Sequence, residues 1–265
     1  MIKLFNRMLV SFQNEEEVEY LTRYAKVIKE KYSGIEVVGL FVKPIEGVMK
    51  YDYLKGYYPT STEWEYIEKT IRFEKEAEEK KKEKIKKKFL SLMGDSKFYI
   101  RSGDLAEVLL EEMKLFDVLV ISKPKDIGHE LKALFKNHYR PVIFVPKLEN
   151  YSFEKILVAN DHRFEFYKSL FSFMGIFEKV KTIDSISVNV REEDRENVNI
   201  YFNKAGRNIE CFYEDGDITN VILEYSKRYD LLLMGDLQQS FIFEKVTGKP
   251  GIKIIKEIDK PIFMG

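Results

Sequence analysis

The chain has 265 residues, of which 45% are hydrophobic, and this is enough for two buried cores. Its 44 lysine and arginine residues equal its 44 aspartate and glutamate residues, so no overall charge draws it to nucleic acid or to an anionic membrane. The single cysteine, Cys211, excludes an internal disulfide and a cysteine-based zinc cluster. No run of 18 apolar residues is present, so we expect a globular, cytoplasmic protein with neither a membrane span nor a signal peptide.

In the first half, short β-rich apolar runs alternate with segments of helical periodicity, which is the pattern of βα units on a parallel sheet. We predict its five strands at residues 8–12, 35–42, 97–100, 118–121 and 142–145. The fourth and fifth runs are almost continuously apolar, as burial on both faces of a parallel sheet demands. The pattern predicts a doubly wound α/β domain over residues 1–148.

An insertion at about residues 51–93 distinguishes this half. Its aromatic, turn-rich start at 51–60 can cover a ligand, but covering the core or contacting a second copy is the interpretation we favour. A capping-box pattern, Thr62-x-x-Glu65, predicts the start of a long helix. We expect its apolar stripe to comprise Trp64, Ile67, Ile71, Ile85, Phe89 and Leu92. Lysines at 80–88 follow four glutamates at helical spacing, which favours a solvated, salt-bridged face over a phosphate or lipid contact.

The second half repeats the first. The Gly103-Asp-Leu step and the later run from Asp117 recur 113 residues on, as Gly216-Asp-Ile and the run from Asp230. Self-similarity on the scale of a whole domain indicates duplication rather than a solenoid. We predict strands at 156–159, 182–188, 208–213, 231–234 and 261–264, in a second domain over residues 149–265. Each repeated glycine precedes an aspartate that begins a helix, which a turn with an N-cap explains.

Chemistry in a doubly wound sheet is expected at the carboxyl ends of the strands, where the strand order reverses. In the second half the first strand ends at Asp161, and the fourth ends at Met234 and Gly235. Asp161 either contacts a ligand or caps the helix predicted at 164–175. Further along, Gly248-Lys249 precedes a helix that begins near Pro250. This step forms either an anion site at a helix N-terminus or a tight turn with a solvated lysine.

These features resemble the universal stress protein family over both halves: the hydrophobic-Leu-Val first strands, the Gly-Asp-Ile/Leu steps, the fourth strands ending in Gly or Ser, and the closing Pro-Val/Ile-Phe. The resemblance implies two tandem Rossmann-like domains of the adenine-nucleotide-α-hydrolase type, each with a five-stranded parallel sheet flanked by helices. Nucleotide-binding members have Gly-x-x-Gly, nine residues, then Gly-Ser/Thr after the fourth strand, and an aspartate closing the first. The nucleotide-site residues that the resemblance implies are Asp161, Met234, Gly235, Gln238, Gly248 and Lys249.

Both halves depart from the family pattern. Gln238 stands at the second glycine, where a side chain restricts positive φ, and Lys249 replaces a hydroxyl donor with a cation that can still meet a phosphate. In the first half Gln13 occupies the aspartate position, Ser122 occupies the first glycine position, and the loop is seven residues shorter. We therefore expect the first half to bind no nucleotide in the family's manner, and to scaffold or dimerise instead.

Motifs of other enzyme classes are missing from the sequence, and His129, His138 and His162 lack metal-ligand spacing. We expect no catalytic centre, no metal site and at most slow ATP hydrolysis. The resemblance implies a cytoplasmic stress-response protein whose repeats pack as an intramolecular pseudo-dimer, with a homodimer as a further expectation. Its regulatory ligand would be ATP, ADP or AMP with Mg²⁺, bound in the second half. The alternative is a nucleotide-free interaction module in which both loops have degenerated.

Overall fold

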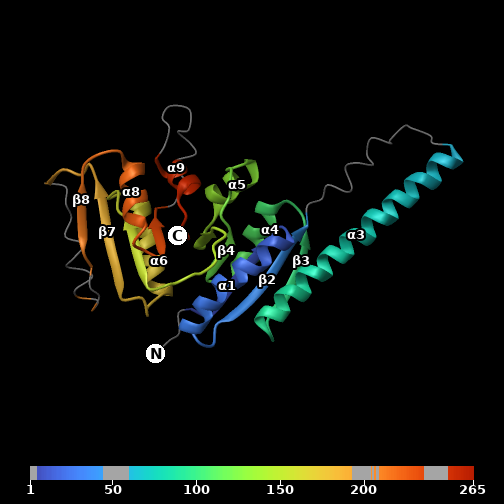
Figure 1. Ribbon diagram of the computed structural model, residues 1–265, viewed down its shortest axis with the longest axis horizontal. Helices are drawn as coiled ribbons and strands as arrows, with labels where there is room; N and C mark the ends of the chain where they lie inside the picture. The colour runs from blue at the N-terminus through green and yellow to red at the C-terminus, as the bar shows by residue number, and fades with distance from the viewer. Residues whose placement is uncertain (1–4, 44–59, 193–203, 205, 207–208, 236–249) are drawn as a thin grey trace.

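The computed structural model describes residues 5–43, 60–192, 204, 206, 209–235 and 250–265, and these form two α/β halves that share one sheet (Figure 1). The described strands form a ten-stranded sheet in the order β3-β2-β1-β4-β5-β10-β9-β6-β7-β8. Each half contributes five neighbouring strands, and its first strand lies between its second and fourth. This reversal of strand order defines a doubly wound sheet.

The first half follows the predicted element order. Its strands are β1 (Arg7–Phe12), β2 (Glu36–Lys43), β3 (Lys97–Ser102), β4 (Val118–Ser122) and β5 (Val142–Val145), and all its strand pairs are parallel. Its helices are α1 (Glu15–Lys31), α3 (Ser61–Met93), α4 (Leu105–Glu112) and α5 (His129–Asn137), with a 3₁₀ turn at Met113–Leu115. The strands β4 and β5 are buried throughout except at Ser122, as their continuous apolar runs predict.

The second half has the same construction. Its strands are β6 (Lys155–Ala159), β7 (Thr182–Val188), β8 (Cys211–Glu214), β9 (Leu231–Met234) and β10 (Ile262–Met264). Its helices are α6 (Phe164–Ile176), α8 (Ile218–Ser226) and α9 (Pro250–Glu257). The third strand of this half was predicted at 208–213, but β8 begins only at Cys211, and residue 208 lies outside the described residues. Edge strands bury one row of side chains less completely, so their apolar pattern marks their ends poorly.

The two parallel sheets join through their fifth strands. β5 and β10 pair antiparallel, with Phe263 opposite Ile143 at the centre of the contact. Helices α1, α3 and α6 pack on one face of the sheet, and α4, α5, α8 and α9 pack on the other. The predicted fold class, two doubly wound halves that each have a five-stranded parallel sheet flanked by helices, is confirmed. The predicted boundary at residues 148 and 149 falls between β5 and β6 and stays a prediction.

Aromatic side chains from both halves meet on the α1 and α6 side of the sheet. Phe177 of the second half lies with its ring centroid 5.2 Å from that of Phe5 and 5.6 Å from that of Tyr32, both from the first half. Nearby, the rings of Tyr24 and Tyr151 are 5.4 Å apart. The Lys179 backbone N–H donates to the Tyr32 hydroxyl at 3.1 Å. The halves therefore share one buried apolar cluster as well as one sheet.

A repeated aspartate fixes the start of the first strand in each half. One carboxylate oxygen of Asp117 accepts hydrogen bonds from the backbone N–H groups of Asn6 and Arg7, at 2.8 and 2.9 Å. Asp230 does the same for Glu154 and Lys155, both at 2.9 Å. These aspartates are 113 positions apart, and the sequence identified them as repeated residues without predicting a role for them. The structure gives them a common role as acceptors for the entrance of β1 and β6.

The other repeated pair, the Gly-Asp step, is a helix start in both halves, as predicted. Asp104 caps α4 by accepting the Glu107 N–H at 3.0 Å, and Asp217 caps α8 by accepting the Asn220 N–H at 2.9 Å. Gly216 has a φ of +142°, a conformation that favours glycine.

The start of α3 differs from the prediction. The capping box lies at Thr60 and Glu63, not at Thr62 and Glu65: the Thr60 Oγ1 accepts the Glu63 N–H at 3.4 Å, and the Glu63 carboxylate accepts the Thr60 N–H at 2.8 Å. Both pairs have the required spacing, so spacing alone could not choose between them. Of the predicted tyrosine-rich segment 51–60, only Thr60 lies within the described residues.

The predicted apolar stripe of α3 is buried only towards the end of the helix. Ile85 and Phe89 are fully buried, whereas Trp64 is 48% exposed. The salt-bridged face is confirmed, since Lys84 and Lys88 pair with Glu15 and Glu19 of α1, at 2.9 and 3.6 Å. Figure 1 shows the N-terminal part of α3 extending away from the other described elements.

Candidate functional site

The second half has its switch point between β6 and β9. These strands are parallel neighbours, yet the helices that follow them, α6 and α9, pack on opposite faces of the sheet. The two connections therefore diverge at the carboxyl ends of β6 and β9, which is where doubly wound proteins bind their ligands. Three of the predicted site residues, Asp161, Met234 and Gly235, lie at this edge.

Asp161 follows β6 and has a side chain that is 56% exposed. One carboxylate oxygen accepts the Arg163 N–H at 3.1 Å, and the other lies 3.9 Å from the Arg163 Nε. The N-cap of α6 is Arg163, which makes no side-chain cap. The alternative that Asp161 is the N-cap of this helix is therefore wrong, because Asp161 stands two residues too early. Its carboxylate stiffens the turn before the helix and still faces solvent.

The turn around Asp161 depends on neighbours whose part in it the sequence did not predict. Asn160 is buried and its side-chain oxygen accepts the His162 N–H at 2.8 Å. His162 adopts a left-handed φ of +56°, and its Nε2 lies 3.2 Å from the Ser187 Oγ at the end of β7. At the same edge Asn189, with φ +57°, exchanges two hydrogen bonds with the backbone of Gly216. Asparagine tolerates a left-handed backbone conformation better than most residues, and this is the one sequence signal that could have predicted a turn at Asn189.

Gly235 leaves room for α6 at the end of β9. A Cβ atom on Gly235 would lie 3.0 Å from the Phe166 backbone nitrogen and 3.2 Å from the Glu165 carbonyl carbon. Glycine is required here by close backbone packing, whether or not a ligand binds. The preceding Met234 is buried. The remaining predicted site residues, Gln238, Gly248 and Lys249, lie outside the described residues, and α9 begins directly after them at Pro250.

The corresponding edge of the first half is filled by its own side chains. The Tyr20 hydroxyl donates to the Ser122 Oγ at 2.6 Å, at the position of the family's first glycine. The Glu17 carboxylate accepts the Gln13 N–H at 2.6 Å, at the position of the family's aspartate. Burial raises the pKa of Glu17, and burial raises the pKa of Tyr20 to about 12. Both contacts favour the prediction that this half binds no nucleotide in the family's manner.

Solved structures of other proteins have a similar fold over almost the whole length of this chain. A universal stress protein from Archaeoglobus fulgidus DSM 4304 matches with a TM-score of 0.67 and 16% identity, over 97% of each chain. A putative universal stress protein from Pseudomonas aeruginosa UCBPP-PA14 matches with a TM-score of 0.61 and 13% identity, over 98% of this chain and 92% of that one. The chain has the universal stress protein fold.

A functionally unknown protein from Pseudomonas aeruginosa PAO1 shares this fold, with a TM-score of 0.61, 13% identity and coverage of 98% of this chain and 92% of that one. No family model and no curated protein matches the sequence. The assignment of the universal stress protein fold therefore rests on structure, since the sequence is only 13–16% identical to those of these structural neighbours.

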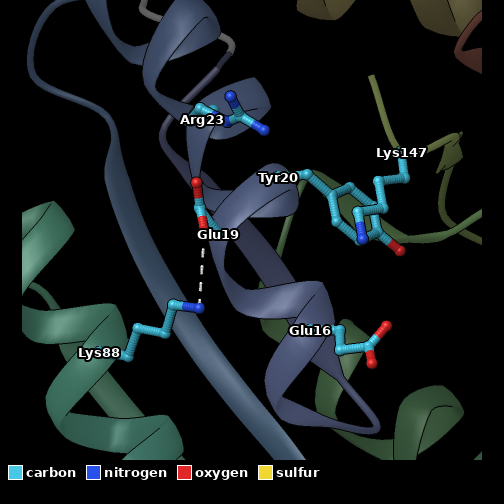
Figure 2. Close-up of a pocket in the computed structure, with 6 residues that line it drawn as sticks. All are labelled: Glu16, Glu19, Tyr20, Arg23, Lys88 and Lys147. Atoms are coloured by element: carbon cyan, nitrogen blue, oxygen red, sulfur yellow. Dashed lines mark ion pairs between the residues drawn. The ribbon is translucent and has the colours of Figure 1, made fainter. Parts of the chain in front are cut away.

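A small polar pocket opens beside Tyr20 in the first half of this universal stress protein fold (Figure 2). Its volume is about 220 Å³, and its lining residues are Glu16, Glu19, Tyr20, Arg23, Lys88 and Lys147. Lys88 pairs with Glu19, and the Arg23 guanidinium donates to the backbone oxygens of Leu148 and Glu149. Acidic and basic groups alternate around it, so it lacks the single sign of charge that a phosphate site uses.

Metal ligands do not gather in the part of the chain that the structure describes: no three His, Cys, Asp or Glu residues there could hold a metal ion together. None of the helices in that part is long and apolar enough to cross a membrane.

Proposed function

We propose that this chain is a cytoplasmic, universal stress protein-like stress-response protein whose second half binds an adenine nucleotide as a regulatory ligand. The observation that carries the proposal is the difference between the two switch points. In the second half an exposed carboxylate, Asp161, and a glycine, Gly235, end adjacent strands. In the first half the equivalent positions are Gln13 and Ser122, which are hydrogen-bonded to Glu17 and Tyr20 of α1.

The proposed roles follow the resemblance to nucleotide-binding universal stress proteins. Asp161 contacts the nucleoside, and the loop from Met234 and Gly235 through Gln238 to Gly248 and Lys249 wraps the phosphates. The ligand is ATP, ADP or AMP, with Mg²⁺ as the counter-ion of the phosphates. The proposal assigns no catalytic residue and at most slow ATP hydrolysis. Bound nucleotide would instead control partner binding.

The test is thermal unfolding of the purified protein with and without millimolar Mg-ATP, ADP or AMP, after assay of the preparation for co-purified nucleotide. Ligand at about 100 times its Kd should stabilise the protein by roughly 2.7 kcal/mol. Asp161→Ala and Gly248→Val should each remove most of this shift. Gln13→Ala, at the equivalent position of the first half, is the matched control and should keep it. Gly235→Ala is unsuitable, because its Cβ would disturb α6 even without a ligand.

An absent shift together with absent co-purified nucleotide would overturn nucleotide binding. That result would favour the alternative, a nucleotide-free interaction module with both loops degenerate, and would direct the search to protein partners.

A further inference from the structure

The long helix α3 is anchored at one end only. Its C-terminal part packs on the first half of the molecule through Ile85, Phe89 and Met93, all buried. Nearer the middle of the helix, Glu78 forms an ion pair with Lys43 at the end of β2. The N-terminal part of the helix extends away from the other described elements (Figure 1). With 33 residues, α3 is about 50 Å long, and roughly half of that length projects.

One face of α3 is exposed along the whole helix. Residues spaced alternately by four and three positions form this face, which we call the outward stripe: Tyr66, Thr70, Phe73, Ala77, Lys80, Lys84, Lys87 and Ser91. All are exposed except Thr70, which is half-buried. Tyr66 and Phe73 are each 73% exposed, which is unusual for large apolar side chains. The spacing is that of a helix-pairing seam, in which every stripe residue can meet a second helix.

The charges of α3 are separated along its length. Residues 61–79 include seven acidic and three basic residues, whereas residues 80–93 include one acidic and seven basic residues. The projecting half is therefore acidic and the anchored half basic. A helix of this kind is complementary to a second copy of itself that runs in the opposite direction, because the acidic half of each copy then lies along the basic half of the other.

We propose that α3 is a self-association site, at which two copies of this chain pair antiparallel through their outward stripes. The stripe is symmetric about its middle, so one register matches it throughout. Phe73 then faces Lys84 of the second copy, and Ala77 faces Lys80 of the second copy. Tyr66 and Thr70 face Ser91 and Lys87 in the same way. Each stripe lysine meets an uncharged side chain, on which its methylene stem packs. The ammonium groups of Lys80 and Lys87 lie near the partner's acidic half, whereas that of Lys84 stays paired with Glu15 of its own α1.

The parallel alternative is unfavourable on the same face, because it would stack Lys80, Lys84 and Lys87 each on its own copy. In the antiparallel pair the main part of each molecule sits at the basic end of its own α3, and the two basic ends lie apart. The buried face of α3, with Ile85 and Phe89, stays on its own molecule. This association is independent of nucleotide binding in the second half.

Reversing charges on α3 tests both whether the partner is a second copy of this chain and whether the two helices run antiparallel. Sedimentation at high micromolar concentration and low salt should show wild-type dimers that dissociate roughly tenfold more readily at high salt. Lys80→Glu with Lys87→Glu should abolish self-association, and so should Glu74→Lys with Glu76→Lys. An equimolar mixture of these two double variants should form dimers again, because both ends are then complementary. Glu68→Gln, on the side of α3 away from the outward stripe, is the control and should leave the dimer in place.

Cysteine cross-linking tests the register of the two α3 helices directly. The variants are made in a Cys211→Ser background, which removes the only native cysteine. A short bis-maleimide should join Ala77→Cys protein to Lys80→Cys protein. Tyr66→Cys protein should not cross-link with itself, since its two sites would be about 37 Å apart along the antiparallel pair. Circular dichroism confirms that each variant keeps its helix. A monomeric wild type, a dimer that neither double variant weakens, or efficient self-cross-linking at position 66 would overturn the proposal.

Discussion

At the scale of single residues, the two repeated aspartates Asp117 and Asp230 hold the first strand of each half by the same hydrogen bonds. Asp117→Ala and Asp230→Ala should each lower the free energy of unfolding by about 1–3 kcal/mol, because each removes the acceptor of two backbone N–H groups at a strand entrance. Urea unfolding measures the change. Asp215→Ala, in an exposed turn, is the control and should stay within about 0.5 kcal/mol of wild type. Equal effects of all three substitutions would contradict the proposed role.

Glu36 should make stability depend on pH. Its carboxylate lies 2.7 Å from the Lys97 Nζ and 2.7 Å from the Arg7 Nε, and these hydrogen bonds hold the pKa of Glu36 below its usual value. A lowered folded-state pKa contributes stability above the unfolded pKa of about 4.3, and the contribution is lost as the pH falls through the folded value.

Glu36→Gln should therefore reduce the free energy of unfolding by about 0.5 kcal/mol near neutral pH, the scale of a partly exposed ion pair. The difference from wild type should shrink as the pH falls below about 4. Urea unfolding across a pH series measures it, with the exposed Glu68→Gln as control. A difference that persists unchanged at the acid end would sink the assignment.

At the scale of secondary-structure elements, periodicity and turn residues predicted all ten described strands and the helix starts at Asp104 and Asp217. Local signals suffice for these features because buried parallel strands and side-chain caps are determined within a few residues. The α3 start was misplaced by two residues because Thr60 and Thr62 offer the same capping spacing. The apolar stripe of α3 did not predict which part of the helix packs on the sheet and which part projects, because both parts have the same local sequence pattern.

The candidate site was predictable only in part. Asp161 and Gly235 could be placed at neighbouring strand ends from the repeat, because the switch point follows from strand order. The contact of Tyr20 with Ser122 joins residues 102 positions apart, and the His162 contact with Ser187 spans 25. Such contacts depend on tertiary packing, which no local pattern encodes. The predictions for Gln238, Gly248 and Lys249 stay predictions.

At the scale of the whole molecule, the shared aromatic cluster should make the two halves unfold together. Phe177→Ala removes a fully buried ring that contacts Phe5 and Tyr32 of the first half, and should cost about 3–5 kcal/mol. Calorimetry should show one transition at a lower temperature, with matching calorimetric and van't Hoff enthalpies. Phe164→Ala, at a side chain 80% exposed, is the control. Two separate transitions, of which only one shifts, would refute joint unfolding.

The antiparallel contact of β5 with β10 has a consequence for how the repeats diverged. Two separate single-repeat chains joined in this way would come apart on dilution, whereas repeats in one chain meet at a fixed effective concentration of about millimolar order. Their pairing therefore survives at any cellular abundance. Because each half has its own stretch of sequence, a substitution in one is not imposed on the other. One half could close its strand ends with Tyr20 and Glu17 while the other kept an exposed Asp161.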